Sequence, residues 1–283
     1  MRVAVAAALL SLAVSAVAAS SAPVAVAAPE EISLSVRSSG AVGVPVTVNG
    51  QGPFTFLLDT GSSHTTLGSR VAERLGLPVV AQVRVTTPAG VQLQPVVAVA
   101  SMAIGSARLE GLMPSVVSIA ELRSLEPGID GVVGQDFLRA FDYTVDYRRK
   151  RLRFTADSEG AHARLPLVRS GERSLVELPG ADGGAPVRMV PDSGSEGFVV
   201  FERNGRTALA LSYTDDSFGV SALSMQRAGR RAVLRELRVG ELTLRNQPAV
   251  VIARDGDADG LLPLHGFASV SFSNSEGYLA LRK

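Results

Sequence analysis

Two short acidic segments of the chain have the residue types for acid–base chemistry. Asp59-Thr60-Gly61 follows the apolar run 56–58, and Asp192-Ser193-Gly194 follows the run 189–191. Two carboxyl groups held about 3 Å apart cannot both ionise cheaply, so they share one proton and titrate as a coupled pair. Such a pair offers an acid and a base at one place and can activate water for attack on a carbonyl group. Gly61 and Gly194 leave space for the backbone to approach the carboxyl groups closely.

An internal duplication strengthens the case for these two segments. An isolated Asp-Thr-Gly triplet arises easily by chance, and the plainer interpretation of Asp59 is a turn carboxylate that caps its own backbone. Segments 56–62, 102–109 and 130–133, however, recur in the same order at 189–195, 237–244 and 259–262. The offsets of 133, 135 and 129 residues are nearly constant, which indicates duplication rather than coincidence. We therefore expect two similar lobes, 29–156 and 165–283, separated by the polar stretch at 157–164.

Apolar residues of the chain mostly alternate with polar ones, as they do in half-buried strands. The valines at 42, 44, 46 and 48 predict one strand, and residues 54–58 predict the strand that returns beside it. Asn49-Gly50 between them supplies the positive φ angles of a tight hairpin turn. Only two short helices are predicted, at 69–75 and 135–141. The pattern predicts an all-β fold with a few short helices.

The first-lobe segments resemble the pepsin-like and retropepsin-like aspartic peptidases. The residues that carry the resemblance are Val48-Asn49-Gly50, Pro53-Phe54, the segments 57–63 and 72–77, Gly131-Val132-Val133-Gly134 and Asp136-Phe137-Leu138. The resemblance covers nearly the whole chain after residue 28, closely in the first lobe and loosely in the second. It implies two barrel-type lobes with a cleft between them. There Asp59 and Asp192 would activate water for the hydrolysis of peptide bonds, without a metal or an organic cofactor.

The same resemblance implies roles for the residues beside the two aspartates. Thr60 and Ser193 would bond across the lobe interface and hold the two loops in register. Ser62 and Ser195 would each hydrogen-bond the neighbouring aspartate and tune it.

A lid over the substrate is also implied, because in this family a hairpin of the first lobe folds over the peptide and excludes water. The best match is the hairpin at 83–91, with its tip at Thr87-Pro88-Ala89-Gly90. Pepsin-like enzymes place a tyrosine on this hairpin, and the segment has none. The lid is therefore closer to the retropepsin kind, and no substrate preference follows from the resemblance.

The second lobe departs from the family pattern at three places. Pro191 directly precedes Asp192, Pro263 stands where the first lobe has Gly134, and Leu264-His265-Gly266 replaces the start of the helix at 135. Because proline removes a backbone donor, alternatives to a monomeric enzyme stay open. One is a protein of the same fold that binds peptides without cleaving them. Another is a homodimer that is active through two first lobes, and a purely structural envelope protein is a third.

The N-terminal residues predict export. Met1-Arg2 precedes an apolar run at 3–19, and the small-residue patterns at 16–18 and 25–27 are typical of signal-peptide cleavage sites. We expect a signal peptide at 1–28 and a mature protein in the periplasm or outside the cell, free of the membrane; an uncleaved membrane anchor is the alternative. The chain has no cysteine, so packing rather than disulfides must hold the exported fold.

Charge and ligand-type residues narrow the range of partners. A formal net charge of +1 argues against nucleic acid, whose phosphates call for a basic excess. His64, His162 and His265 are too dispersed in the sequence to suggest a metal site. The segment 255–260 looks like the start of a calcium loop, but its twelfth position is Gly266 instead of the required glutamate. The expected partner is a peptide or protein substrate, cleaved by a monomer.

Overall fold

The computed structural model describes residues 30–37, 39–87, 90–180, 183–222, 225–254 and 256–283. The predicted signal peptide at 1–28 lies outside the described residues. Within them, none of the helices is both long and apolar enough to cross a membrane.

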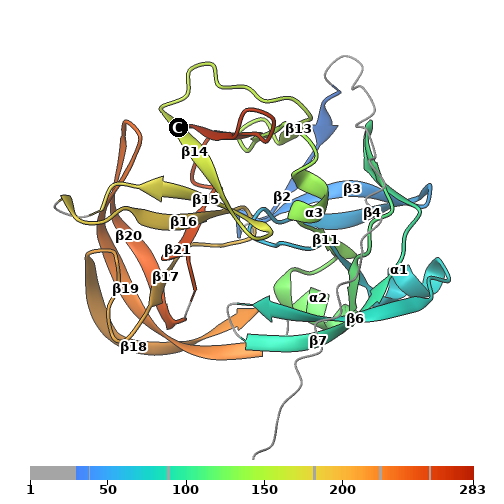
Figure 1. Ribbon diagram of the computed structural model, residues 1–283, viewed down its shortest axis with the longest axis horizontal. Coiled ribbons are helices and arrows are strands. Elements are labelled where there is room, and N and C mark those ends of the chain that lie inside the picture. Colours follow the sequence, from blue (N-terminus) through green and yellow to red (C-terminus); the bar gives the residue numbers. More distant parts are fainter. Residues whose placement is uncertain (1–29, 38, 88–89, 181–182, 223–224, 255) are drawn as a thin grey trace, which may run out of the picture.

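The described chain consists mainly of strands, which confirms the prediction of an all-β fold with short helices (Figure 1). One sheet has ten strands in the order β6-β7-β10-β5-β11-β4-β3-β8-β9, with β2 paired to β3, and the other has 13 in the order β1-β13-β12-β22-β23-β14-β15-β16-β21-β17-β20-β19-β18. The first-lobe elements are β1 (Ile32–Ser33), β2 (Ser35–Val36), β3 (Val42–Val48), β4 (Gln51–Leu58), β5 (Thr66–Gly68), α1 (Ser69–Arg74), β6 (Val79–Thr87), β7 (Gly90–Val97), β8 (Ser101–Ile104), β9 (Ala107–Glu110), β10 (Ser115–Val117), α2 (Ile119–Leu125), β11 (Gly131–Val133), α3 (Gln135–Leu138), β12 (Tyr143–Asp146) and β13 (Arg151–Arg153). The second-lobe elements are β14 (Ala163–Ser170), β15 (Arg173–Leu178), β16 (Val187–Asp192), β17 (Phe198–Glu202), β18 (Leu211–Ala222), β19 (Met225–Val239), β20 (Leu242–Ala253), β21 (Gly260–Pro263), β22 (Ser269–Ser273) and β23 (Tyr278–Arg282).

The hairpin of β3 and β4 shows how local sequence produces the first lobe. The valines of β3 are buried, as alternation along a strand with one inward face predicts. Asn49 and Gly50 have φ angles of 52° and 73°, the positive values that a tight hairpin turn requires. The main hydrophobic core continues from this hairpin into the second lobe. Burial of apolar side chains therefore joins the two lobes.

The two lobes repeat the same strand pairing. In the first lobe, β11 runs parallel to β4 and antiparallel to β5, and β5 runs parallel to β10. In the second lobe, β21 lies in the same way between β16 and β17, and β17 runs parallel to β20. The repeated segments 56–62 and 189–195 begin on β4 and β16, so the matched ladders agree with an internal duplication.

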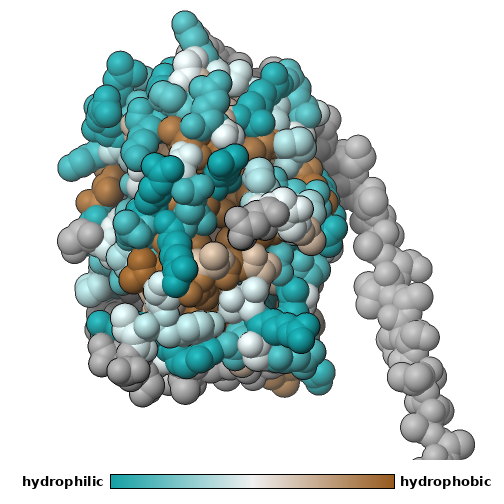
Figure 2. Space-filling view, turned by 90° about the vertical axis from the view of Figure 1, so that its left-hand side faces the viewer, coloured by the Kyte–Doolittle hydropathy of each residue, from teal (hydrophilic) through white to brown (hydrophobic). Residues whose placement is uncertain are grey.

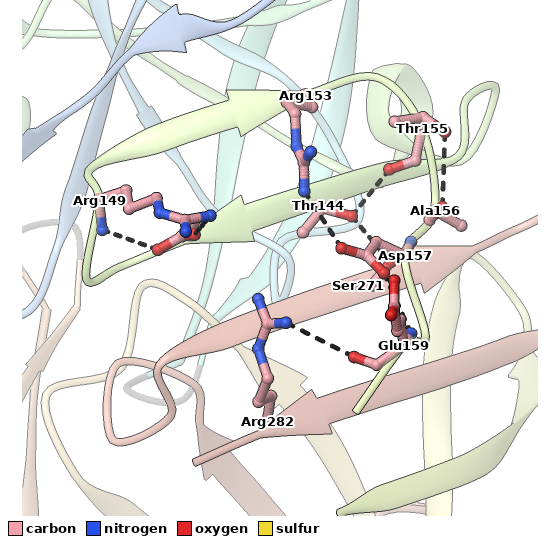
Figure 3. Close-up of polar contacts among 10 residues, drawn as sticks. Thr144, Arg149, Arg153, Thr155, Ala156, Asp157, Glu159, Ser271 and Arg282 are labelled. Atoms are coloured by element: carbon pink, nitrogen blue, oxygen red, sulfur yellow. Dashed lines mark hydrogen bonds and ion pairs between the residues drawn. The ribbon is translucent and has the colours of Figure 1, made fainter. Parts of the chain in front are cut away.

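Strands of both lobes meet in one part of the larger sheet, in the order β13-β12-β22-β23-β14. Hydrogen bonds around Ser271 hold the chain that follows β13 against this part of the sheet (Figure 3). The Ser271 hydroxyl lies 2.9 Å from the Thr144 hydroxyl and accepts the amide of Asp157 at 2.7 Å. Arg153 donates to the Asp157 carboxylate at 3.2 Å. The polar stretch after β13 therefore begins fixed to the sheet that the lobes share.

Three short α-helices lie among the described strands, two of them at predicted places. α1 ends at Arg74, and α3 ends at Leu138, before the end predicted at 141. The sequence patterns do not predict α2. Its start is a capping box, in which the Ser118 hydroxyl accepts the amide of Glu121 while the Glu121 carboxylate accepts the amide of Ser118.

Candidate active site

The two acidic segments occupy matching places at the ends of parallel strands. Asp59 follows β4 directly, and its amide donates to the carbonyl of Val133 on β11 at 3.0 Å. Asp192 is the last residue of β16 and lies opposite Pro263 on β21. Each lobe therefore presents one carboxyl group at the same point of the same strand arrangement.

Four reciprocal hydrogen bonds join the two segments across the lobes. The Thr60 hydroxyl donates to the carbonyl of Pro191 at 2.8 Å and accepts the amide of Ser193 at 3.0 Å. In the mirror arrangement, the Ser193 hydroxyl donates to the carbonyl of Leu58 at 2.7 Å and accepts the amide of Thr60 at 3.0 Å. Thr60 and Ser193 are both buried. These bonds fix the position of one acidic segment relative to the other.

Close packing around the carboxyl groups explains the two glycines. A Cβ atom on Gly61 would lie 2.5 Å from Cγ of Asp192, and one on Gly194 would lie 2.8 Å from Cγ of Asp59. Both distances are well inside the contact distance of carbon atoms, about 3.5–4.0 Å. Each carboxyl group therefore packs against the backbone of the opposite segment, where only glycine leaves enough room.

Backbone amides rather than serine hydroxyls hold the two carboxyl groups. Asp59 Oδ1 accepts the amides of Gly61 at 2.9 Å and Ser62 at 3.1 Å, and Asp192 Oδ1 accepts the amide of Gly194 at 2.7 Å. The expectation that the hydroxyls of Ser62 and Ser195 bond the aspartates is wrong. They donate instead to the carbonyls two residues ahead, at 2.8 and 2.7 Å, because the turn after each aspartate brings that carbonyl within reach.

Burial raises the pKa values of both carboxyl groups. The pKa of Asp192 lies well above its usual range, first because the group is buried and second because the charge of Asp59 lies close by. Burial also raises the pKa of Asp59, although hydrogen bonds from the amides of Gly61 and Ser62 oppose that rise. The hydrogen bond between the two carboxyl groups raises the pKa of Asp192 and lowers that of Asp59. The two carboxyl groups therefore favour a state in which one is protonated and the other is ionised.

Comparison with known proteins identifies the family to which the chain belongs. Residues 44–137 and 178–264, which are more than half of the chain, match the family described as aspartyl protease. The chain belongs to the aspartyl protease family. Among solved structures, 253 chains match it. One of these is the crystal structure of basic 7S globulin from soybean, with a TM-score of 0.49 and 11% sequence identity over 90% of this chain and 94% of that one. No curated protein sequence matches the chain.

The proline beside the second aspartate does not disturb the hydrogen bonds between the two acidic segments. Pro191 contributes its carbonyl group, which accepts the Thr60 hydroxyl. β15 pairs with β16 no further than Met189, so the position of Pro191 lies beyond the end of that ladder. The absent amide of Pro191 therefore leaves all four bonds between the segments in place.

Two polar side chains of α3, for which the sequence patterns predict no role, hold the first-lobe loop in place. Nε2 of Gln135 donates to the carbonyl of Thr60 at 2.9 Å. The Asp136 carboxylate accepts the amide of Thr65 at 2.9 Å and its hydroxyl at 2.6 Å. Both residues directly follow the repeated block at 130–133 and Gly134, which is the signal that the sequence offers for them.

Each lobe carries a long hairpin. The first-lobe hairpin of β6 and β7 contains the candidate lid at 83–91; Thr87 and Gly90 end its strands, while Pro88 and Ala89 lie outside the described residues. The sequence patterns do not predict the second-lobe hairpin of β18 and β19. It borders β20 as β7 borders β10. β19 also lies against β7, so the two hairpins meet (Figure 1).

A separate pocket lies on the second lobe. It measures about 500 Å³ and is lined by Gly184, Ala185, Pro186, Arg188, Arg203, Ala208, Gly256, Asp257 and Asp259. Arg203 pairs with Asp259 at 2.9 Å, and Arg188 pairs with Glu177 at 3.0 Å. Figure 2 shows the side of the molecule formed by second-lobe strands, where hydrophobic side chains reach the surface in a hollow framed by hydrophilic ones.

Over the part of the chain that the structure describes, no group of three or more His, Cys, Asp or Glu side chains could hold a metal ion.

Proposed function

We propose that the protein is an exported aspartic endopeptidase that hydrolyses peptide bonds with water activated between Asp59 and Asp192. Membership of the aspartyl protease family supports a peptidase in general terms. The observation that carries the specific proposal is the reciprocal set of hydrogen bonds between the segments of Thr60 and Ser193. These bonds bring one carboxyl group from each lobe together, with Asp192 buried and Asp59 half-buried.

The proposed reaction divides between the two carboxyl groups. A water molecule between them gives a proton to Asp59 while its oxygen bonds to the scissile carbonyl carbon, and Asp192 gives its proton to the carbonyl oxygen. The resulting tetrahedral intermediate carries two hydroxyl groups. When its C–N bond breaks, the leaving nitrogen takes the proton from Asp59, and one hydroxyl returns a proton to Asp192. Both carboxyl groups are then in their starting states.

The remaining features of the proposal concern the substrate and its access. An extended peptide would lie between the lobes and form main-chain hydrogen bonds like an added strand. The tip at Thr87-Pro88-Ala89-Gly90 would close over it. Thr60, Gly61, Ser193 and Gly194 hold and space the carboxyl groups, and no metal or organic cofactor takes part. The mature protein would act as a monomer in the periplasm or outside the cell, with lobes 29–156 and 165–283 each supplying half of the site.

Cleavage of an unbiased peptide library by the mature protein, from about pH 3 to pH 8, tests this proposal. The wild type should cleave, and Asp59→Asn should lose cleavage because an amide cannot take the proton from water. Asp257→Asn, at the separate pocket, is the matched control and should cleave like the wild type. Circular dichroism shows whether each variant keeps its fold. Full activity of folded Asp59→Asn would contradict the mechanism, and a folded wild type that binds peptides without cleaving them would support the binding-protein alternative.

A further inference from the structure

The strands beside Asp59 present a continuous row of side chains on one face of the sheet. Asp59 projects on the same side as Leu57, because alternate residues of a strand share a face. Directly opposite residues of neighbouring strands also share a face. Going outward from Leu57, the paired residues are Val132 on β11, Thr66 on β5 and Ser115 on β10. We call these four residues the first-lobe row.

The first-lobe row points away from the main core. Leu58, Leu67 and Val133, which alternate with residues of the row, belong to the main hydrophobic core. Leu57 and Val132 belong to a separate, smaller cluster. The row therefore lies on the face of the sheet where Asp59 projects and where a substrate of this enzyme would bind.

The outer part of the first-lobe row is polar. The hydroxyl groups of Thr66 and Ser115 lie 3.0 Å apart and are buried. Ser115 also pairs with Val96 on β7, and Gln94 two residues earlier shares its face, at the diagonal distance of about 7 Å that long side chains can span. Gln94 is only 2% exposed, yet neither Oε1 nor Nε2 has a hydrogen-bond partner.

An unpartnered carboxamide in such a place calls for an explanation, because burying it is costly. The two hydroxyl groups share one hydrogen bond, so one proton and several lone pairs stay available between them. Together with the carboxamide of Gln94, the two hydroxyl groups can both donate and accept hydrogen bonds. A ligand group that also donates and accepts would satisfy all three side chains.

The matching row of the second lobe is aliphatic. Going outward from Val190, the paired residues are Leu261, Val199 and Val250. Val250 then pairs with Arg231 on β19, so Gly229 occupies the position that Gln94 has on β7. The duplicated lobes therefore differ in chemistry at the same structural place.

We propose that Thr66, Ser115 and Gln94 form a polar subsite for the carboxamide side chain of a substrate asparagine or glutamine, on one side of the scissile bond. The carboxamide matches the donors and acceptors of the three residues, and a charged group would be buried beside them without an opposite charge. The corresponding place in the second lobe takes an aliphatic side chain. This inference rests on the proposed peptidase function.

Matched peptides test the subsite. Once the library gives a cleaved sequence, each position beside the scissile bond is varied among glutamine, leucine and glutamate, and kcat/KM is measured for each peptide. At one position the wild type should favour glutamine over leucine by roughly tenfold, the effect of one or two buried hydrogen bonds, and should cleave the glutamate peptide worst. Gln94→Met should lose that preference and keep the leucine peptide as a good substrate. Gln247→Met, the same change at a second-lobe glutamine that donates to the carbonyl of Arg245, should keep it.

Further measurements separate the subsite from the peptidase function and from the stability of the fold. Cleavage of the leucine peptides shows whether the proposed peptidase function holds, independently of the subsite. Gln94→Met should unfold at the same or a higher urea concentration than the wild type, because it removes an unpartnered buried carboxamide. Thr66→Val should weaken the glutamine preference at the same position as Gln94→Met. A glutamine preference that survives both substitutions, or a wild type that favours leucine at every position, would overturn the subsite.

Discussion

Replacing Thr60 by valine tests how the two lobes are held together at the site. The valine keeps the shape of the side chain but removes the hydroxyl that bonds Pro191 and Ser193. The carbonyl of Pro191 and the amide of Ser193 would then be buried without a partner. Each orphaned group destabilises a fold by about 1–3 kcal/mol. The free energy of unfolding should therefore fall by about 2–6 kcal/mol, and cleavage should weaken as the carboxyl groups lose their alignment.

Urea unfolding followed by circular dichroism measures this loss. Thr243→Val is the matched control, because Thr243 is exposed on β20 and surface changes of this kind stay within about 0.5 kcal/mol. Ser193→Ala should destabilise the protein through the mirror pair of bonds. The double variant should lose less than the sum of the two single losses, because the segments separate once either pair is broken. A loss below about 1 kcal/mol in Thr60→Val would refute the role given to these bonds.

Three further predictions follow from the site. Gly61→Ala should lower kcat/KM by about 10²-fold or more, because its Cβ would lie 2.5 Å from Cγ of Asp192 and displace that group; peptide-cleavage kinetics measure this, and an unchanged rate would contradict the close packing. Asp192→Asn should become more stable relative to the wild type as the pH rises above about 4. Burial raises the pKa of Asp192 in the folded state, so above about pH 4 the unfolded wild type releases a proton that the folded protein keeps, and its stability falls as the pH rises. In thermal melts the difference between the two proteins should stop changing below about pH 4, and a difference that keeps changing there would count against this reasoning. Asp136→Ala should lower the free energy of unfolding by about 2–3 kcal/mol, because Thr65 loses charged hydrogen bonds from its amide and hydroxyl. Urea unfolding checks this against exposed Glu110→Ala, and equal midpoints would refute it.

Short-range signals explain why the fold and the acidic pair could be predicted from the sequence. Asn49-Gly50 fixes one hairpin through its positive φ angles, and the valines before it mark one buried face. The duplicated acidic triplets predict two lobes with one carboxyl group each. All of these features depend on residues that are close in sequence or repeated along it.

Four other features have no such signal in the sequence and could not be predicted from it. The hydroxyls of Ser62 and Ser195 could donate either to a carboxylate or to a nearby carbonyl. They donate to the carbonyl, because the turn after each aspartate brings it within hydrogen-bond distance. Pro191 looks disruptive in the sequence, yet its carbonyl is what the opposite lobe uses. The hairpin of β18 and β19 escaped prediction because polar residues interrupt its apolar alternation. Gln94 shows its buried, unpartnered state only when the sheet is assembled.

The dependence of cleavage on protein concentration in Asp192→Asn tests most directly whether one chain supplies both carboxyl groups. If Asp59 and Asp192 of the same chain form the pair, Asp192→Asn should show no cleavage at any concentration, while the wild-type rate per molecule should stay constant on dilution. Cleavage by Asp192→Asn that grows with the square of its concentration would contradict this account. It would show instead that two first lobes pair their Asp59 residues.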